Sequence, residues 1–140
     1  MARVDFYILA EAGPRLRQTF ACRLAEKAYR LANTVHIHAG SPEDAASLDD
    51  LLWTFRDGSF VPHEILGDAT VEPDAPITIG CRETTARDLL INLDDDVPAF
   101  AGTFPRVAEL VTADPACRQA GRRRFAQYRD AGHELETHNL

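Results

Sequence analysis

Long apolar runs, a cysteine framework and an excess of basic residues are all missing from this chain of 140 residues. No apolar stretch approaches the roughly 20 residues of a membrane-spanning helix, and the first residues lack the basic start and cleavage pattern of a signal peptide. The widely spaced Cys22, Cys81 and Cys117 are typical of buried thiols in a reducing cytoplasm rather than of disulfides. The formal charge of −7 disfavours a protein that coats DNA or RNA, because non-specific affinity comes from neutralising phosphates.

The glycine motifs with which nucleotide enzymes hold phosphate are missing as well. Neither GxxxxGK[ST] nor GxGxxG occurs, and the first loop, residues 10–14, has one glycine and no lysine. Without glycines the backbone amides of that loop cannot close on a phosphate. The nucleophile motif GxSxG is also absent, so the sequence offers no convincing catalytic constellation.

Two clusters nevertheless leave an alternative open, a small nucleotide- or metal-dependent enzyme. His36 and His38 lie two residues apart on one face of a predicted strand, with His63 or Cys81 as a conceivable third metal ligand. The acidic run Asp94–Asp96 follows an apolar strand, as magnesium-binding acids do in nucleotide enzymes. Both patterns are also common on strands of ordinary acidic proteins, and we therefore predict no metal and no cofactor.

Apolar residues make up 45% of the chain and follow strand-like and helix-like patterns in turn. Short runs rich in β-branched and aromatic residues predict strands, whereas apolar residues at steps of three and four predict helices. The predicted strands cover 4–9, 34–38, 77–80 and 88–93, and the predicted helices cover 14–31, 41 to about 55, 99–111 and 115–131. This alternation predicts one α/β domain, residues 1–140, with a largely parallel central sheet flanked by helices.

The charges are segregated along the chain. Residues 41–114 hold sixteen acidic and four basic side chains, a formal charge of −12 that disfavours contact with a phosphate backbone. Residues 115–129 hold five arginines and no acidic residue. A run of like charge is usually a solvated surface, so the placement of these arginines on their helix decides its meaning.

The predicted C-terminal helix, which Asp114 caps and Pro115 begins, has an arginine stripe and an apolar stripe. At 100° per residue the arginine stripe is about 60° wide and consists of Arg118, Arg122, Phe125 and Arg129. The apolar stripe consists of Cys117, Gly121, Tyr128 and Ala131. Arg124 falls on the apolar stripe and is expected to extend its head group to solvent. An aromatic ring among guanidiniums suits a short acidic peptide with an apolar anchor, and single-stranded nucleic acid is a second possible ligand.

Four segments occur in an order that resembles the chi subunit family of bacterial DNA polymerase III. They are Asp5-Phe6-Tyr7-Ile8-Leu9, Leu52-Trp53-Thr54-Phe55 with Ser59-Phe60-Val61-Pro62-His63, Asp88-Leu89-Leu90-Ile91-Asn92-Leu93, and Arg124-Phe125-Ala126-Gln127-Tyr128-Arg129-Asp130-Ala131-Gly132. The resemblance covers nearly the whole chain. It implies a nucleotide-binding-like fold without a phosphate loop, and a non-catalytic accessory subunit of the clamp-loader complex that acts in DNA replication.

The resemblance also implies two partner surfaces. The acidic C-terminal tail of single-stranded DNA-binding protein would bind on the last helix and the element before it, at Val111, Arg118, Arg122 and Phe125, with Arg129 beside them. A partner subunit called psi, where the organism has one, would bind at Trp53, Phe60, Val61 and Pro62. The protein would thus be a cytoplasmic replisome component, associated with the nucleoid, that contacts DNA mainly through another protein.

The chain departs from the family pattern at the tail site. Where relatives have a lysine after the aromatic residue this chain has Ala126, and the aromatic residue itself is Phe125 rather than tyrosine. One cationic contact is therefore absent, and Arg129 or Arg123 could replace it. The loss of one charge-assisted hydrogen bond corresponds to about 1–2 kcal/mol of tail affinity.

Overall fold

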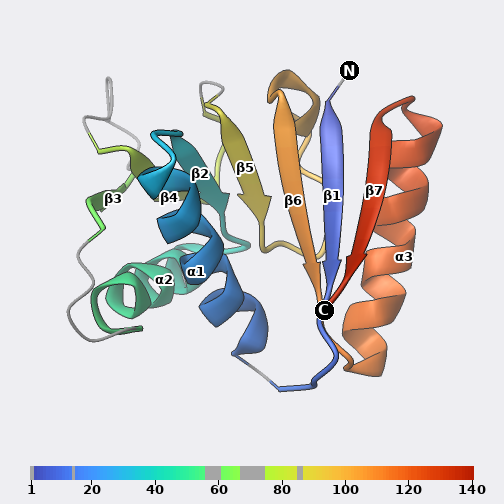
Figure 1. The fold of residues 1–140 in the computed structure, drawn as a ribbon, viewed down its shortest axis with the longest axis horizontal. Helices are drawn as coiled ribbons and strands as arrows, with labels where there is room; N and C mark the ends of the chain where they lie inside the picture. The colour runs from blue at the N-terminus through green and yellow to red at the C-terminus, as the bar shows by residue number, and fades with distance from the viewer. Residues whose placement is uncertain (1, 14, 56–60, 67–74, 85–86) are drawn as a thin grey trace.

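The computed structural model describes residues 2–13, 15–55, 61–66, 75–84 and 87–140 (Figure 1). The strands in these ranges are β1 (Arg3–Ile8), β2 (Val35–His38), β3 (His63–Ile65), β4 (Ile77–Gly80), β5 (Leu89–Asn92), β6 (Arg106–Val111) and β7 (Glu134–Asn139). They form one sheet in the order β3-β4-β2-β5-β6-β1-β7, and all neighbouring pairs are parallel. The predicted α/β fold with a largely parallel sheet is confirmed.

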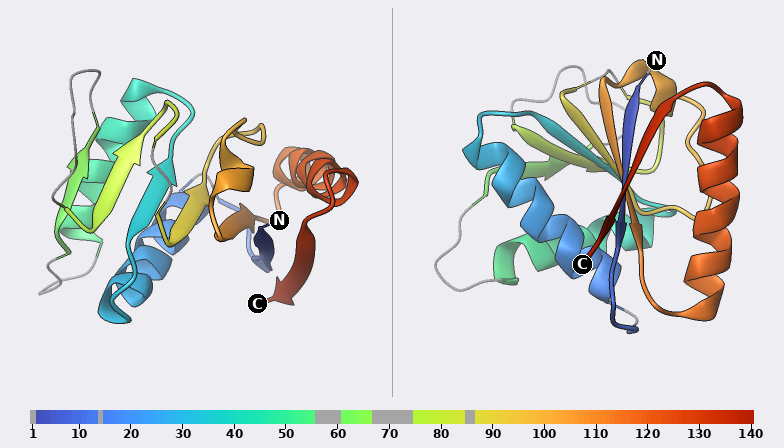
Figure 2. Two further views of the ribbon diagram at one scale, coloured as in Figure 1. Left: turned by 90° about the horizontal axis from the view of Figure 1, so that it is seen from above. Right: turned by 45° about the vertical axis from the view of Figure 1, so that its right-hand side comes forward.

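Helices cover both faces of this sheet. They are α1 (Leu16–Arg30), α2 (Pro42–Thr54) and α3 (Pro115–Asp130), with a short 3₁₀ helix η1 (Ala101–Thr103). Alternate residues of β6 show which helix covers which face, because successive side chains of a strand point in opposite directions. Ala108 and Leu110 belong to the core cluster under α1 and α2, whereas Val107 and Val111 belong to the cluster under η1 and α3. Figure 2 shows α1 and α3 on opposite sides of the sheet.

The predicted helix starts are largely correct. Ser41 caps α2 by accepting a hydrogen bond from the Asp44 N–H at 3.2 Å, and Pro42 occupies the first helical position. Gly132, with φ of +85°, adopts the left-handed conformation just after α3, where glycine is favoured. None of the described helices is long and apolar enough to cross a membrane.

The prediction of a helix over 99–111 is wrong. Only η1 is helical there, and β6 follows as an interior strand between β5 and β1. Because β6 is covered on both faces, apolar side chains point to both, with Arg106 and Glu109 the exceptions, and such a run cannot be distinguished from a buried helix by its pattern. Two strands were also missed, the three-residue β3 and the mostly polar edge strand β7.

The cysteines have three different surroundings. Cys22 is buried in the core of α1, and burial raises the pKa of its thiol to about 12, so this group is inert at neutral pH. Cys81 and Cys117 are only half-buried, contrary to the expectation of buried thiols. All three are free thiols, as expected of a chain without a disulfide framework.

Candidate functional site

The arginine-rich segment folds as α3, and its start is tied to the loop that follows β1. Asp114 stands at the N-cap position and Pro115 begins the helix, as predicted, but the Asp114 side chain makes no capping hydrogen bond. Its carboxylate instead accepts hydrogen bonds from the Thr112 hydroxyl at 2.7 Å and from the Gly13 N–H at 3.1 Å. The Thr112 bond, followed by the Gly13 bond, lowers the pKa of Asp114, so the carboxylate holds this junction in its ionised form.

A glycine lets α3 lie close to the sheet. A Cβ atom added to Gly121 would lie 2.8 Å from Val111 Cγ2, nearer than carbon atoms can approach without displacement. Any other residue at position 121 would therefore push α3 away from β6. The close approach leaves Val111 as the floor of a hollow beside the helix.

This hollow is a pocket of about 200 Å³ between α3 and the strands β1, β6 and β7. Its lining consists of Phe6, Ile8, Val111, Arg118, Gly121, Arg122, Phe125 and Thr137. Four of the five predicted tail-site residues, which are Val111, Arg118, Arg122 and Phe125, are thus brought together. We call this hollow the Arg118/Arg122 pocket.

An aromatic contact holds the wall of the Arg118/Arg122 pocket. The ring of Phe125 packs edge-on against the ring of Phe6 at a centroid distance of 5.2 Å, and Phe6 is buried beneath it. Arg118 and Arg122 lie one helical turn apart on the same face of α3, and both are exposed. None of the residues that line this pocket is acidic. The result is a small apolar hollow with two cationic groups on its rim.

The remaining basic residues of α3 lie elsewhere. Arg129, the fifth predicted tail-site residue, does not line the pocket, and its Nε donates to Asp130 Oδ1 at 3.3 Å. Arg123, considered as a substitute for the missing lysine, lines a different pocket. Ala126, the substituted position itself, is half-buried.

The prediction that Arg124 extends its head group to solvent is wrong. Its side chain is 2% exposed, and its Nε donates to Glu109 Oε1 at 2.8 Å. Glu109 Oε2 accepts two further hydrogen bonds, from the Tyr128 hydroxyl at 2.7 Å and from Asn92 Nδ2 at 2.8 Å. Sequence reasoning missed this network because it assigned Glu109 to a helix.

The Glu109 network anchors α3 through charge. Burial raises the pKa of Glu109, and the nearby Arg124 guanidinium opposes that rise, as do the donors from Asn92 and Tyr128. All three partners donate, and an ionised carboxylate is the form that accepts every one of these bonds. Burial and the adjacent Glu109 also raise the pKa of Tyr128, which therefore stays a neutral donor.

Three of the four residues predicted to bind psi are described, and they lie near the end of α2 and the start of β3. Trp53 is 51% exposed, and its ring lies 4.7 Å from the ring of His63, so it is not a core residue of α2. Val61 is buried in the core and Pro62 is half-buried. Phe60 lies outside the described residues. The described part of this surface therefore offers Trp53 and Pro62 to a partner.

The histidines of the enzyme alternative have structural partners. His36 Nδ1 lies 2.8 Å from Thr78 Oγ1, and His38 Nε2 lies 3.4 Å from Asp94 Oδ2. Burial lowers the pKa of His36 to about 3, and it also lowers the pKa of His38, against the raising effect of Asp94. His63 lies on β3 and is bound to Val61 and Asp49 instead of joining the other two histidines.

The acidic run Asp94–Asp96 takes part in hydrogen bonds within the turn that follows β5. The Asp94 N–H donates to Asn92 Oδ1 at 3.0 Å, and the Asp95 N–H donates to Asp94 Oδ1 at 2.7 Å. Among the described residues, the one group of three potential metal ligands is Asp5, Glu136 and His138, outside every predicted cluster. Asp5 already pairs there with Arg106 at 3.3 Å, a bond that competes with a metal ion.

The fold and these contacts define an α/β protein with an all-parallel sheet and an arginine-rimmed pocket, and the comparisons with known proteins narrow this class. Residues 1–136 match the family described as DNA polymerase III chi subunit, HolC. The chain is 44% identical to DNA polymerase III subunit chi of Pseudomonas aeruginosa over 142 aligned residues, covering 100% of this chain and 98% of the relative. The subunit chi of Haemophilus influenzae is 37% identical (97% and 96% covered), and that of Escherichia coli is 31% identical (98% and 97% covered).

The chain therefore belongs to the DNA polymerase III chi subunit family, and the predicted resemblance is confirmed. Its place is that of an accessory subunit of the replicative polymerase.

Solved structures with the same fold are distant in sequence. The crystal structure of T4 UvsW aligns with a TM-score of 0.68 at 10% identity, covering 99% of this chain and 41% of that one. A structure of Saccharomyces cerevisiae Dbp5 aligns with a TM-score of 0.62 at 10% identity, covering 99% and 42%. At this identity the likeness concerns the fold alone.

Proposed function

We propose that the protein is a binding module that holds the acidic C-terminal tail of single-stranded DNA-binding protein in the Arg118/Arg122 pocket. The observation that carries the proposal is the pocket itself, an apolar hollow floored by Val111 with two exposed guanidiniums on its rim. A phenylalanine at the end of an acidic tail has the complementary chemistry. Its ring fits an apolar hollow beside Phe125, and its carboxylates suit bidentate pairing with arginine.

Charge on the rest of the chain favours a peptide over a nucleic acid as the ligand. The −12 segment at 41–114 supplies β6, one of the strands that line the pocket, and its neighbour β5. A long phosphate backbone would have to avoid this acidic region, whereas a short tail needs only the pocket and its rim. We infer that the protein contacts DNA mainly through the tail of its partner, in the cytoplasm, without catalytic activity of its own.

The proposal includes a second docking surface, for a partner subunit that connects the protein to the clamp loader. Trp53 is a large aromatic side chain, half of it exposed, and its ring packs on His63, the residue that follows the half-buried Pro62. Exposed aromatic residues of this kind are typical anchors at protein interfaces. We propose Trp53 and Pro62, with Phe60 and the buried Val61 that precede Pro62 in sequence, as the site for a psi subunit that links the protein to the clamp loader.

Calorimetric titration of the full chain with a phenylalanine-ended acidic peptide tests the tail site. We expect binding at micromolar concentrations and a loss of about 10- to 100-fold in Arg122→Ala, since a charge-assisted hydrogen bond contributes about 1.5–3 kcal/mol. Arg123→Ala is the matched control, because this neighbouring exposed arginine lines a different pocket. Added salt should weaken binding. Absence of heat at micromolar concentrations, or equal affinities for both variants, would contradict the proposal.

A further inference from the structure

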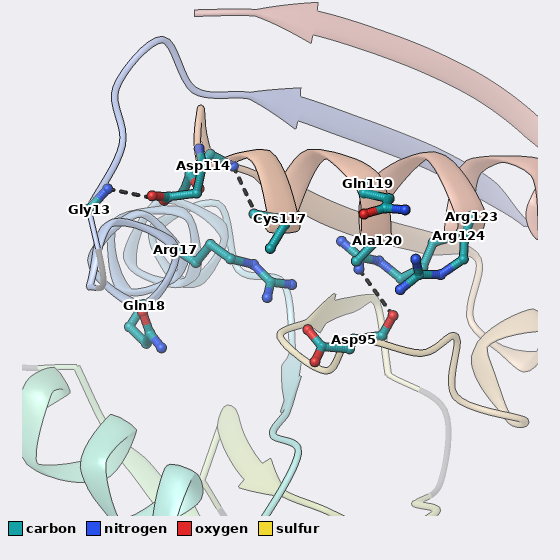
Figure 3. Close-up of a pocket in the computed structure, with 12 residues that line it drawn as sticks. Gly13, Arg17, Gln18, Asp95, Asp114, Cys117, Gln119, Ala120, Arg123 and Arg124 are labelled. Atoms are coloured by element: carbon teal, nitrogen blue, oxygen red, sulfur yellow. Dashed lines mark hydrogen bonds between the residues drawn. The ribbon is translucent and has the colours of Figure 1, made fainter.

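A larger pocket lies on the other side of α3, at the carboxyl edge of the sheet (Figure 3). It measures about 460 Å³ and is bounded by the start of α1, the loops after β5 and β6, and the first half of α3. The connection after β1 leads to α1 on one face, and the connection after β6 leads to α3 on the other. In open parallel sheets, the crevice where neighbouring connections diverge in this way is the usual place for a ligand.

Two guanidiniums converge in this crevice from opposite elements. Arg17 extends from α1 and Arg124 from α3, and Figure 3 shows their ends directed toward the same gap. Burial, followed by the nearby charge of Arg124, lowers the pKa of Arg17, so each cation makes the other less favourable. An anion placed between them would remove that repulsion. The exposed Arg123 adds a third guanidinium at the lining.

These side chains hold unused hydrogen-bonding groups. Arg124 is 1% exposed, and its Nη2 has no partner among the described residues, nor has the buried Nε of Arg17. The remaining bonds of Arg17 are long, 3.4 and 3.5 Å from its Nη2 to the carbonyl oxygens of Asp94 and Asn92. Buried N–H groups without an acceptor are costly, which makes them a sign of an absent ligand oxygen or water. The buried Gln18 Oε1, at the same lining, is also unpartnered among these residues.

Two acids lie at the same lining and limit what the pocket can hold. Asp114 already accepts from Gly13 and Thr112, so its charge is engaged at the start of α3. Asp95 lies at the lower edge of the gap in Figure 3, where its backbone oxygen accepts from Arg124 Nη1 at 3.1 Å. The lining has three arginines and these two carboxylates, and the buried Glu109 behind it pairs with Arg124, so the preference for an anion rests on the N–H groups without a partner among the described residues rather than on net charge.

We propose that this crevice binds a phosphate-bearing small molecule whose oxygens accept hydrogen bonds from Arg17, Arg123 and Arg124. A phosphate group suits the site better than a carboxylate, because its terminal oxygens can accept from three guanidiniums at once. The site needs no glycine-rich loop, since side-chain guanidiniums replace the backbone amides that such a loop provides. Free phosphate or pyrophosphate and a mononucleotide share this chemistry and differ only in the rest of the molecule.

Thermal unfolding and calorimetry of the full chain test the proposal with inorganic phosphate, pyrophosphate and AMP, each against sodium acetate at equal ionic strength. Phosphate compounds should raise the melting temperature by mass action, and acetate should not. Arg17→Gln should weaken phosphate binding at least tenfold, and Arg123→Gln should weaken it less. Arg23→Gln, an exposed position on the same helix, is the matched control and should bind as the unmodified protein does.

The outcomes separate the possibilities. A response to AMP that clearly exceeds the response to phosphate and pyrophosphate supports a nucleotide ligand, and equal responses support the free anion. No response to any phosphate compound, or an equal response to acetate, would overturn the proposal. So would unchanged phosphate affinity in Arg17→Gln when circular dichroism shows that this variant is folded. Binding of the acidic tail peptide is measured in parallel and should not change in Arg17→Gln, because Arg17 does not line the Arg118/Arg122 pocket.

Discussion

The buried pair of Arg124 and Glu109 allows a sharp test of how α3 is held on the sheet. In Arg124→Met the apolar part of the side chain is kept, but Glu109 loses its guanidinium partner while it stays fully buried. Tyr128 and Asn92 still donate to the carboxylate, so the change isolates the charge of Arg124. We expect this single substitution to be strongly destabilising.

The magnitude follows from burial. Both side chains are at most 2% exposed, so solvent screening does not reduce their interaction. Removing one partner of a buried ion pair costs about 3–5 kcal/mol, because the other charge stays buried without compensation. For a domain of this size, 1 kcal/mol corresponds to about 3–5 °C in melting temperature, which gives a loss of about 10–20 °C. Replacing both groups, in Arg124→Met with Glu109→Leu, removes the uncompensated charge and should recover much of the loss.

Urea unfolding followed by circular dichroism gives the four free energies of the double-mutant cycle. The expected coupling between positions 109 and 124 is at least about 2 kcal/mol. The reasoning is refuted if Arg124→Met costs under about 1 kcal/mol, or if the two substitutions are additive. Additivity would mean that Glu109 is satisfied by Tyr128 and Asn92 alone, without the ion pair.

Three further predictions concern the helix contact, the buried histidine and the exposed tryptophan. Gly121→Ala should lower the free energy of unfolding by about 1–2 kcal/mol and weaken tail-peptide binding, because overpacking against Val111 outweighs the gain in helix propensity. Adding Val111→Ala to this variant should restore stability, as measured by urea titration. His36 has a pKa of about 3 in the folded protein against 6.5 for the free side chain, so its contribution to stability is complete above about pH 6.5 and is lost as the pH falls toward 3. Urea titrations at pH 7, 6 and 5 should therefore show a slope approaching about 1.4 kcal/mol per pH unit, reduced in His36→Gln, and an unchanged slope in this variant would show that another group titrates. Trp53→Ala should lower the free energy of unfolding by under about 1 kcal/mol, because half of the side chain is exposed. The same variant should fail to capture a psi subunit in pull-down assays, and full capture would show that Trp53 is not part of the psi-binding surface.

The sequence predicts best those elements whose pattern has a single interpretation. Short apolar runs predict the strands β1, β2, β4 and β5, and Ser41 and Pro42 predict the start of α2. The sequence does not predict β6, because a strand covered on both faces shows no alternation of apolar and polar residues, and the proline at position 105 resembles a break within a helix. The sequence does not predict β7 for the opposite reason, because an edge strand with charged side chains lacks an apolar run.

The Arg118/Arg122 pocket could be predicted in part. Helical spacing alone brings Arg118, Arg122 and Phe125 onto one face, and the resemblance adds Val111. Phe6 and Thr137 could not be predicted, because they approach α3 only through the order of β6, β1 and β7 in the sheet. The partner of Arg124 was hidden for the same reason, since Glu109 lies fifteen residues away in sequence, on the strand that was mistaken for a helix.

The five arginines of α3 are one run in sequence and separate groups in space. Arg118 and Arg122 rim one pocket, Arg123 and Arg124 line another, and Arg129 pairs with Asp130. A tail peptide in the Arg118/Arg122 pocket would therefore meet two guanidiniums directly rather than five. The salt dependence of its binding should correspond to about two charge contacts, and a steeper dependence would mean that the peptide extends along α3 toward Arg129. Charge density in the sequence is thus a poor measure of charge at the site, because α3 divides its cations between its two sides.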